Sequence, residues 1–316
     1  MNKLPIWIDG DPGVDDAAAI MVAHDAENLQ VVAISVVAGN APLEMTTKNA
    51  LGLCEMLGAD YPVYRGAGKP LMRPYEDGAE FHGADGMGGA TLPETKRTAE
   101  SEAAWDALYE AAKKYEGKLE VVSMGPLTNI ATALTKYPDL KDRIHRIAIM
   151  GGSVTRGNRT PCAEYNIFAD PEAAQIVFRS GASIVMCGLE VTEKAYLTAE
   201  ELKSVRTSAK GEFYYQASKH ILEKNLEAGH PGFCIHDVCP VLYLSDESLF
   251  GGEQAGVFVE TQAELTLGKT VCDLYSDKQF DVKNTFVVLD VDREGFVRAV
   301  QHALLDEKTG GSENGV

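Results

Sequence analysis

The sequence predicts an α/β protein: one domain built on a doubly wound, mostly parallel open sheet with helices on both faces. Two observations support this prediction. Short, unbroken apolar runs alternate with segments of helical periodicity from the first residues onward, as expected for parallel strands buried on both faces and joined by crossover helices. Glycine-rich polar stretches follow several of these apolar runs, at the strand ends where open α/β sheets bind ligands.

The first part of the chain alternates strand and helix. The first two apolar runs have strand length, and the helix between them has an alanine-rich apolar face. Gly58 is suited to end the second helix, and Ser101 is suited to cap the third. The expected strands span residues 4–8, 29–38, 61–64 and 119–123, and the expected helices span residues 15–26, 42–57, 101–115 and 127–135.

The second part continues the alternation less regularly. Pro171 stands at the start of a helical segment, a position that proline favours, and Thr198 opens a long helical region. The expected strands span residues 144–150, 182–187, 257–260, 269–273 and 286–291, and the expected helices span residues 171–178, 198–227 and 296–305.

Two segments show no clear period, residues 65–100 and 151–169. Loops of this length inside a compact domain are usually functional, so we expect them near a site. We find no internal repeat and no clean linker, and we expect one domain over residues 1–306. Residues 307–316 are polar and are expected to form a disordered tail.

Composition narrows the choice of partners. The net charge is −18, from 47 acidic and 29 basic residues, so the surface repels phosphates and anionic lipids and we expect neither nucleic-acid nor membrane partners. The N-terminus lacks the apolar core of about 7–15 residues that a signal peptide needs. Six scattered cysteines without a C-x-x-C pair indicate reduced, mostly buried thiols in a cytoplasmic protein.

The residues after the first strand carry the strongest chemical signal. Asp9, Asp11, Asp15 and Asp16 place four carboxylates within eight residues, and close carboxylates raise one another's pKa and oppose folding unless a counter-charge is present. A helix N-terminus accommodates one or two of them. An all-oxygen set of ligands favours a hard cation, and Ca²⁺ suits flexible oxygen coordination best.

Other interpretations of this run are weaker. An EF-hand loop needs glycine at its sixth position and glutamate at its twelfth, where this chain has Val14 and Ile20. Zinc is disfavoured because no histidine or cysteine lies near the run. A phosphatase that uses Asp9 or Asp11 as its nucleophile remains possible, although Asp15 and Asp16 are superfluous to that chemistry. No phosphate-binding glycine motif follows the strand.

Further polar motifs fall after other strands or late in the chain. They are Asp9–Ala17 (DGDPGVDDA), Val37–Asn40 (VAGN), His82–Gly86 (HGADG), Gly125–Asn129 (GPLTN), Ala163–Ala174 (AEYNIFADPEAA), His236-Asp237 and Glu264–Val271 (ELTLGKTV). Together and in this order they resemble the inosine–uridine-type nucleoside hydrolase family across nearly the whole chain. The resemblance implies the nucleoside hydrolase fold, a ribonucleoside substrate, one Ca²⁺ and a homo-oligomer, either a dimer or a tetramer.

The resemblance also implies roles for individual residues. It makes Asp11, Asp16, Asp237 and the Met124 carbonyl ligands of Ca²⁺, with Asp11 also the base that activates water. The expected ribose partners are Asp15, Asn40 and Asn166 for the 2′- and 3′-hydroxyls, and Asn158 and Glu164 for the 5′-hydroxyl.

The implied reaction is hydrolysis of the N-glycosidic bond through an oxocarbenium-like transition state. A cation orients the sugar and lowers the pKa of a bound water. The departing base needs a proton, and His236 is the expected acid because histidine titrates near neutral pH. His82, in the first long irregular segment, is expected to contact the base or to act in closure.

Two alternatives to this enzyme remain at this point: the metal-dependent phosphatase, and a non-catalytic nucleoside-binding protein. We interpret Asn129 as a helix or turn cap. Val238 departs from the family, which commonly has proline directly after the His-Asp pair. Residues 223–234, which should face the nucleobase, resemble no specific subtype, so the sequence leaves the preference between purines and pyrimidines open.

Overall fold

The computed structural model describes residues 3–76, 78, 83, 85–275 and 280–305. Its centre is an eight-stranded sheet with the order β3-β2-β1-β4-β5-β6-β12-β9, and all neighbouring strands are parallel except β12 and β9. Its strands are β1 (Leu4–Gly10), β2 (Leu29–Val36), β3 (Val63–Arg65), β4 (Leu119–Ser123), β5 (Ile144–Met150), β6 (Ile184–Cys187), β9 (Phe250–Ala255) and β12 (Thr285–Val291). The predicted doubly wound sheet is confirmed.

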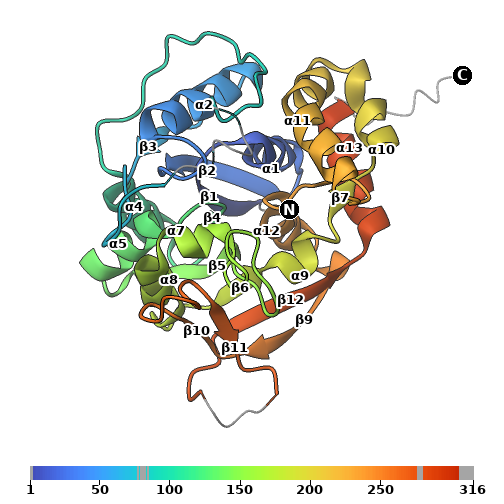
Figure 1. Ribbon diagram of the computed structural model, residues 1–316. Coiled ribbons are helices and arrows are strands. Elements are labelled where there is room, and N and C mark those ends of the chain that lie inside the picture. The colour runs from blue at the N-terminus through green and yellow to red at the C-terminus, as the bar shows by residue number, and fades with distance from the viewer. Residues whose placement is uncertain (1–2, 77, 79–82, 84, 276–279, 306–316) are drawn as a thin grey trace, which may run out of the picture.

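Helices cover both faces of the sheet (Figure 1). Along β1, Ile6 and Ile8 belong to one apolar cluster and Trp7 to the other, because successive side chains of a strand point to opposite faces. The first cluster includes α1 (Val14–Asp25), α2 (Leu43–Met56), α11 (Ala209–Glu227), α12 (Val238–Ser245) and α13 (Arg293–Leu305). The second includes α4 (Ala104–Tyr115), α5 (Thr128–Lys136) and α8 (Pro171–Phe178).

Several short elements connect these layers. Two small antiparallel pairs, β7 with β8 and β10 with β11, lie outside the main sheet. The short helices and strands that connect the layers are α6 (Leu140–Arg143), α7 (Tyr165–Ala169), α9 (Leu189–Thr192), β7 (Tyr196–Leu197), α10 (Ala199–Ser204), η1 (Val205–Thr207), β8 (Phe233–Cys234), η2 (Glu247–Leu249), β10 (Val257–Val259) and β11 (Thr270–Cys272).

Three sequence expectations need correction. The two strands expected near residues 257–260 and 269–273 exist, but they form the separate β10–β11 pair. The long helix expected from Thr198 is broken into α10, η1 and α11, because Ser208 caps a new helix by accepting a hydrogen bond from the Gly211 amide. The irregular segment 151–169 contains α7.

The strand order reverses at β1, since the chain moves outward through β2 and β3 and then returns to β4 on the other side of β1. A crevice at such a switch point is where doubly wound sheets bind ligands. The segments leaving the carboxyl ends of β1, β2 and β4 therefore meet at one place.

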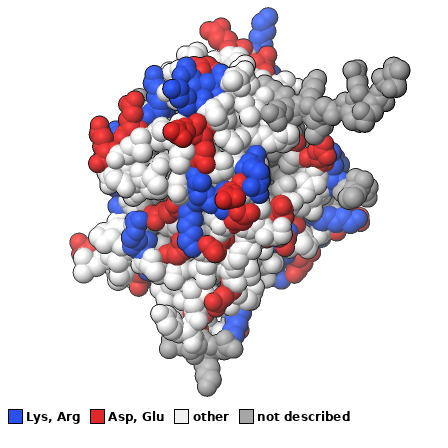
Figure 2. Space-filling model, turned by 90° about the vertical axis from the view of Figure 1, so that its right-hand side faces the viewer, with Lys and Arg blue, Asp and Glu red and all other residues white. Residues whose placement is uncertain are grey.

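The surface carries charges of both signs. On the face shown in Figure 2, basic side chains are interspersed with acidic ones. Among the described residues, we find no helix long and apolar enough to cross a membrane. The tail expected over residues 307–316 lies outside the described residues.

Candidate active site

Four buried carboxylates lie in the last part of β1 or directly after it. Asp9, Asp11 and Asp16 are fully buried and Asp15 is 7% exposed. Asp15 and Asp16 occupy the first turn of α1, where the helix dipole favours negative charge. The Asp16 carboxylate also accepts a hydrogen bond from the Gly13 amide at 2.9 Å. These local contacts compensate part of the charge.

A fifth carboxylate comes from a distant part of the chain. Asp237 stands directly before α12 and is 3% exposed. Carboxylate oxygens of Asp15, Asp16 and Asp237 all lie within 4.8 Å of one another. The structure thus brings together two of the three expected carboxylate ligands, Asp16 and Asp237, and adds Asp15 to them.

Burial dominates the electrostatics of this cluster. Burial and, to a smaller extent, the neighbouring Asp15 together raise the pKa of Asp16 to about 7. The pKa values of Asp11 and Asp237 are raised well above the ordinary range by burial and then by their acidic neighbours. The inner oxygens of Asp11 and Asp16, Oδ1 in each, accept no hydrogen bond from a described residue. Asp11 and Asp16 therefore each keep one buried oxygen that is available to a cation.

Glycines allow the strand ends to pack against the carboxylates. A Cβ atom at Gly10 would lie 2.7 Å from Asp16 Oδ1, and one at Gly125 would lie 2.5 Å from Asp11 Oδ1. A Cβ atom at Gly39 would collide with the other oxygen of Asp11. Only glycine fits at these three positions without displacing a carboxylate.

Asn40 bridges the acidic residues. Its backbone N–H donates to Asp11 Oδ2 at 2.6 Å, and its side-chain amide donates to the Asp11 carbonyl at 3.3 Å and to Asp16 Oδ2 at 3.2 Å. Asn40 therefore orients both carboxylates, which a simple turn cap would not do.

Asn166 lies where β4 and β5 end. Its side-chain amide donates to the Met124 carbonyl at 2.8 Å and to the Met150 carbonyl at 3.1 Å. Its backbone N–H donates to Glu164 Oε1 at 2.9 Å. Met124, Asn166 and Glu164 thus form one continuous chain of contacts.

Glu164 is the N-cap of α7. The amides of Gly152 and Ile167 donate to Oε2 at 2.9 and 3.2 Å, yet burial still raises the pKa of Glu164 to about 7. Asn158 is exposed, and its side-chain oxygen accepts a hydrogen bond from the Tyr165 amide at 3.0 Å. Asn158 is thereby connected to Glu164 through the neighbouring residue.

His236 precedes Asp237 and is partly buried. Its Nδ1 is 2.8 Å from the hydroxyl of the buried Thr192, which fixes the plane of the ring. Burial lowers the pKa of His236, and the negative charges of Asp15 and Glu193 oppose that shift. The other expected histidine, His82, lies outside the described residues.

The interpretation of Asn129 as a cap is wrong. Its side-chain nitrogen donates to Asp9 Oδ1 at 2.8 Å and to the Val36 carbonyl at 3.1 Å, and its oxygen accepts from the Ala67 amide at 2.8 Å. Asn129 therefore joins β1, β2 and the start of the first irregular segment. Turn propensity describes neighbours in sequence, so it could not reveal these distant partners.

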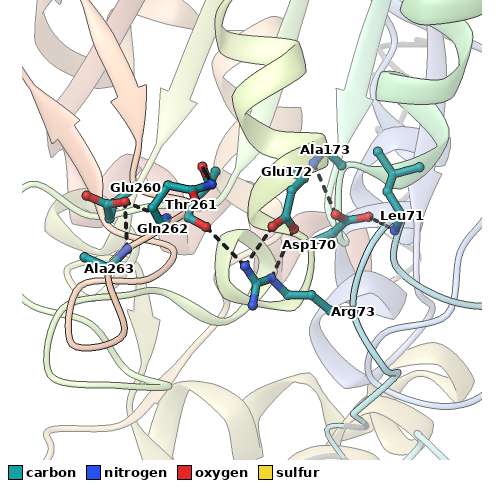
Figure 3. Close-up of polar contacts among 9 residues, drawn as sticks. All are labelled: Leu71, Arg73, Asp170, Glu172, Ala173, Glu260, Thr261, Gln262 and Ala263. Atoms are coloured by element: carbon teal, nitrogen blue, oxygen red, sulfur yellow. Dashed lines mark hydrogen bonds and ion pairs between the residues drawn. The ribbon is translucent and has the colours of Figure 1, made fainter.

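The described start of the first irregular segment is anchored (Figure 3). The Leu71 amide donates to Asp170 Oδ2 at 2.8 Å. The Arg73 guanidinium binds both oxygens of Glu172, at 2.7 and 3.1 Å, and donates to the Thr261 carbonyl at 3.2 Å. Glu172 lies in the first turn of α8, as expected, and it also has this partner. The motif containing Asp170 thus secures a segment that leads toward the site.

Sequence reasoning missed the hydrogen bonds of two tyrosines. The hydroxyls of Tyr75 and Tyr165 donate to the Gly39 carbonyl at 3.1 and 2.9 Å. The sequence offers one weak signal, the position of Tyr165 between Glu164 and Asn166.

An open doubly wound sheet whose switch point holds buried carboxylates defines the class of the protein: a metal-dependent α/β enzyme. Comparison with known proteins identifies the family. Residues 6–298 match the family described as inosine-uridine preferring nucleoside hydrolase. The chain belongs to this family and is a ribonucleoside hydrolase.

Two curated relatives and two solved structures are similar over nearly their whole length. A non-specific ribonucleoside hydrolase, RihC, from Klebsiella pneumoniae (strain 342) is 42% identical over 297 residues, which are 94% of this chain and 96% of the relative. The protein of that name from Escherichia coli O9:H4 (strain HS) is 41% identical over 305 residues, 96% and 98% of the two chains.

Among solved structures, a purine-preferring ribonucleoside hydrolase from Gardnerella vaginalis has a TM-score of 0.90 and 33% identity, covering 95% of this chain and 98% of the other. The plant nucleoside hydrolase PpNRh1 has a TM-score of 0.89 and 31% identity, covering 96% and 99%. The phosphatase and the non-catalytic binding protein are therefore not retained.

Proposed function

We propose that the chain hydrolyses both purine and pyrimidine ribonucleosides with one Ca²⁺, at the site formed by Asp11, Asp15, Asp16 and Asp237. The observation that carries this proposal is the set of buried carboxylates at the switch point, in which Oδ1 of Asp11 and Oδ1 of Asp16 accept no hydrogen bond from a described residue. Support for broad base preference comes from the relatives that are named non-specific.

The donor set fits a calcium ion. Every candidate ligand is an oxygen: the carboxylates of Asp11, Asp16 and Asp237 and the carbonyl of Met124, with Asp15 close to two of them. Hard cations prefer such ligands. When bound there, Ca²⁺ would orient the sugar hydroxyls and lower the pKa of a coordinated water. A divalent charge would also supply the counter-charge that the raised pKa values of the carboxylates demand.

The residues around the carboxylates would bind and orient the ribose. Asp15 would accept hydrogen bonds from the 2′- and 3′-hydroxyls, and Asn40 would accept through its side-chain oxygen, because its amide nitrogen already donates to Asp11 and Asp16. Because the Asn166 amide nitrogen is used by two carbonyls, its oxygen would receive a ribose hydroxyl. Asn158 and Glu164 would hold the 5′-hydroxyl, and the Asn158–Tyr165 contact would have to adjust for this.

Two side chains would move protons. Asp11 has one oxygen held by the Asn40 amide and the other open, so it would accept the proton of the attacking water. His236 would donate a proton to the departing base, and Asp15 would stabilise its charged form. His82 would assist at the base or in closure.

We propose further that the enzyme is a cytoplasmic homo-oligomer, a dimer or a tetramer. All six cysteines are free thiols, as expected in a reducing compartment. Leu265, Val271, Tyr275 and Val282 expose large apolar surfaces around the β10–β11 pair, which would suit burial between subunits.

The proposed reaction is tested with a panel of purine and pyrimidine ribonucleosides, with released ribose measured by a reducing-sugar assay. Activity should be high with calcium and lost after exhaustive chelation, and calcium should restore it. Full turnover in the chelated protein would contradict the metal proposal.

Asp15→Ala is expected to fold and to bind ribonucleosides about 10–100-fold more weakly, because a hydrogen bond to a charged group contributes about 1.5–3 kcal/mol. For the same reason 2′-deoxyadenosine should be a poorer substrate than adenosine by a similar factor. Steady-state kinetics of both substrates measure this. Equal rates on the two would contradict the assigned role of Asp15.

The calcium-free protein should lose stability as pH rises from about 4 to about 7. Burial raises the pKa of Asp9, Asp16 and Glu164 to about 7, so the folded chain retains protons that the unfolded chain has released in this range. The stability present at low pH is therefore lost as pH passes through the folded pKa values. Thermal melts across this range measure the effect, and saturating calcium should remove the part that comes from the proposed ligand Asp16 and leave the parts that come from Asp9 and Glu164.

A further inference from the structure

One peptide group connects two tyrosines to Asp11. The carbonyl of Gly39 accepts hydrogen bonds from the hydroxyls of Tyr75 and Tyr165. The N–H of the same peptide group belongs to Asn40, and it donates to Asp11 Oδ2 at 2.6 Å. Both tyrosine hydroxyls therefore interact with the carbonyl end of a peptide dipole, and the N–H end of the same dipole holds the Asp11 carboxylate.

The environment strengthens this connection. Gly39 and Asn40 are buried, so bulk water does not compete for their peptide group. In such surroundings hydrogen bonds in series polarise one another. Donors at the carbonyl oxygen draw electron density toward it and make the N–H a stronger donor. Asp11 would feel the effect of hydroxyl groups that it does not contact.

The geometry at Asp11 requires a fixed peptide. A Cβ atom at Gly39 would overlap the Asp11 carboxylate, so the peptide lies directly against that side chain. It holds Oδ2, whereas Oδ1 accepts no hydrogen bond from a described residue. Rotation of the peptide would release Oδ2 and turn the open oxygen away from its position.

The two tyrosines come from segments that are far apart in the sequence, each with an anchor of its own. Tyr75 follows the segment that Leu71 and Arg73 attach to Asp170 and Glu172 (Figure 3). Tyr165 is the first residue of α7, and its amide donates to Asn158.

The two anchors are also joined to each other. The neighbour of Tyr75, Glu76, forms an ion pair with Arg159 at 2.7 Å, and the Tyr165 hydroxyl lies 3.3 Å from the Glu76 carbonyl. Two phenol groups from segments far apart in the sequence are thus delivered to one carbonyl oxygen.

We propose that Tyr75 and Tyr165 are positioning residues that hold and polarise the Gly39–Asn40 peptide and so keep Asp11 in its reactive orientation. This inference rests on the proposed role of Asp11 as the base. It adds to that role two side chains that need not touch the nucleobase or the reacting atoms.

The test uses Tyr75→Phe, Tyr165→Phe and the double variant, each of which keeps the aromatic ring and removes only the hydroxyl. Because a neutral hydrogen bond contributes about 0.5–1.5 kcal/mol, kcat with inosine should fall about three- to tenfold in each single variant, with little change in KM. The Asn40 amide proton should move upfield in the NMR spectrum of each variant, and furthest in the double variant, with or without calcium.

Tyr109→Phe is the matched control, because the Tyr109 hydroxyl donates to Asp139, which is not part of the acidic cluster at the end of β1. This control should change neither kcat nor the chemical shift of the Asn40 amide proton. A rise in KM alone, with the Asn40 signal unmoved, would overturn the proposal and reduce the tyrosines to loop anchors. A shifted signal with unchanged kcat would also overturn it. If Asp11 is not the base, Asp11→Asn should retain its turnover. This result distinguishes failure of the proposed function from failure of the role proposed for the tyrosines.

Discussion

Asp11→Asn is expected to lower kcat with inosine by at least about 10³-fold and to weaken calcium binding in the same protein. The substitution removes both a base, whose contribution is typically about 10²–10⁴-fold, and a ligand charge. Asp16→Asn should weaken calcium binding similarly. Calcium titration by calorimetry and steady-state kinetics measure the two effects.

The thermal stability of the calcium-free Asp11→Asn variant should rise, although its kcat and calcium affinity fall. Without calcium, Asp11→Asn should melt at a higher temperature than the parent chain, because it removes a buried carboxyl group whose pKa burial and neighbouring acids raise. Asp106→Asn, at a carboxylate paired with Lys136 on the surface, is the control and should alter neither calcium binding nor kcat. Unchanged turnover of Asp11→Asn in a chelated sample would refute the metal site and the base together.

His236→Ala should slow cleavage of inosine or uridine by about 10²–10⁴-fold, the usual contribution of a general acid. It should slow p-nitrophenyl riboside much less, because that leaving group departs without a proton. Calcium should remain bound through Asp237. If the histidine only positions Asp237, both substrates should lose rate together and calcium affinity should fall as well.

The same residue predicts a pH profile. Burial lowers the pKa of His236 below its ordinary value, so the protonated form becomes scarce as pH rises. kcat/KM for inosine should decline as pH rises through this lowered pKa, and the decline should be absent with p-nitrophenyl riboside. His24→Ala is the matched control, since His24 also places its Nδ1 2.8 Å from a hydroxyl, that of Tyr61, and burial also lowers its pKa.

The sequence predicts the sheet and the acidic centre well because both depend on patterns close along the chain. The apolar runs of β1, β2, β4 and β5 are continuous, and the acidic run follows the first of them directly. By contrast, β9 has the sequence FGGEQA, which shows no strand-like alternation. It is a strand because β12 offers it a partner.

The contacts of the site between residues far apart in the chain could not be predicted from the sequence. Asn129 contacts Asp9 across 120 residues, and Tyr165 contacts Gly39 across 126. Neither residue type is unusual where it stands. Their partners are fixed by the switch-point topology, which brings segments together only once the sheet has formed.

Asp16 and Asp237 meet although most of the chain separates them, one at the start of α1 and the other at the start of α12. A cation shared between them would act as a removable cross-link, closing a very long loop as a disulfide does and restricting the unfolded chain in proportion to the logarithm of that loop's length. Assembly of the ion site must therefore wait until the segment around α12 has been synthesised. The ion would then tie the first helix of the chain to a helix that is made before β9 and β12, and its affinity would report whether α1 and α12 have been brought together.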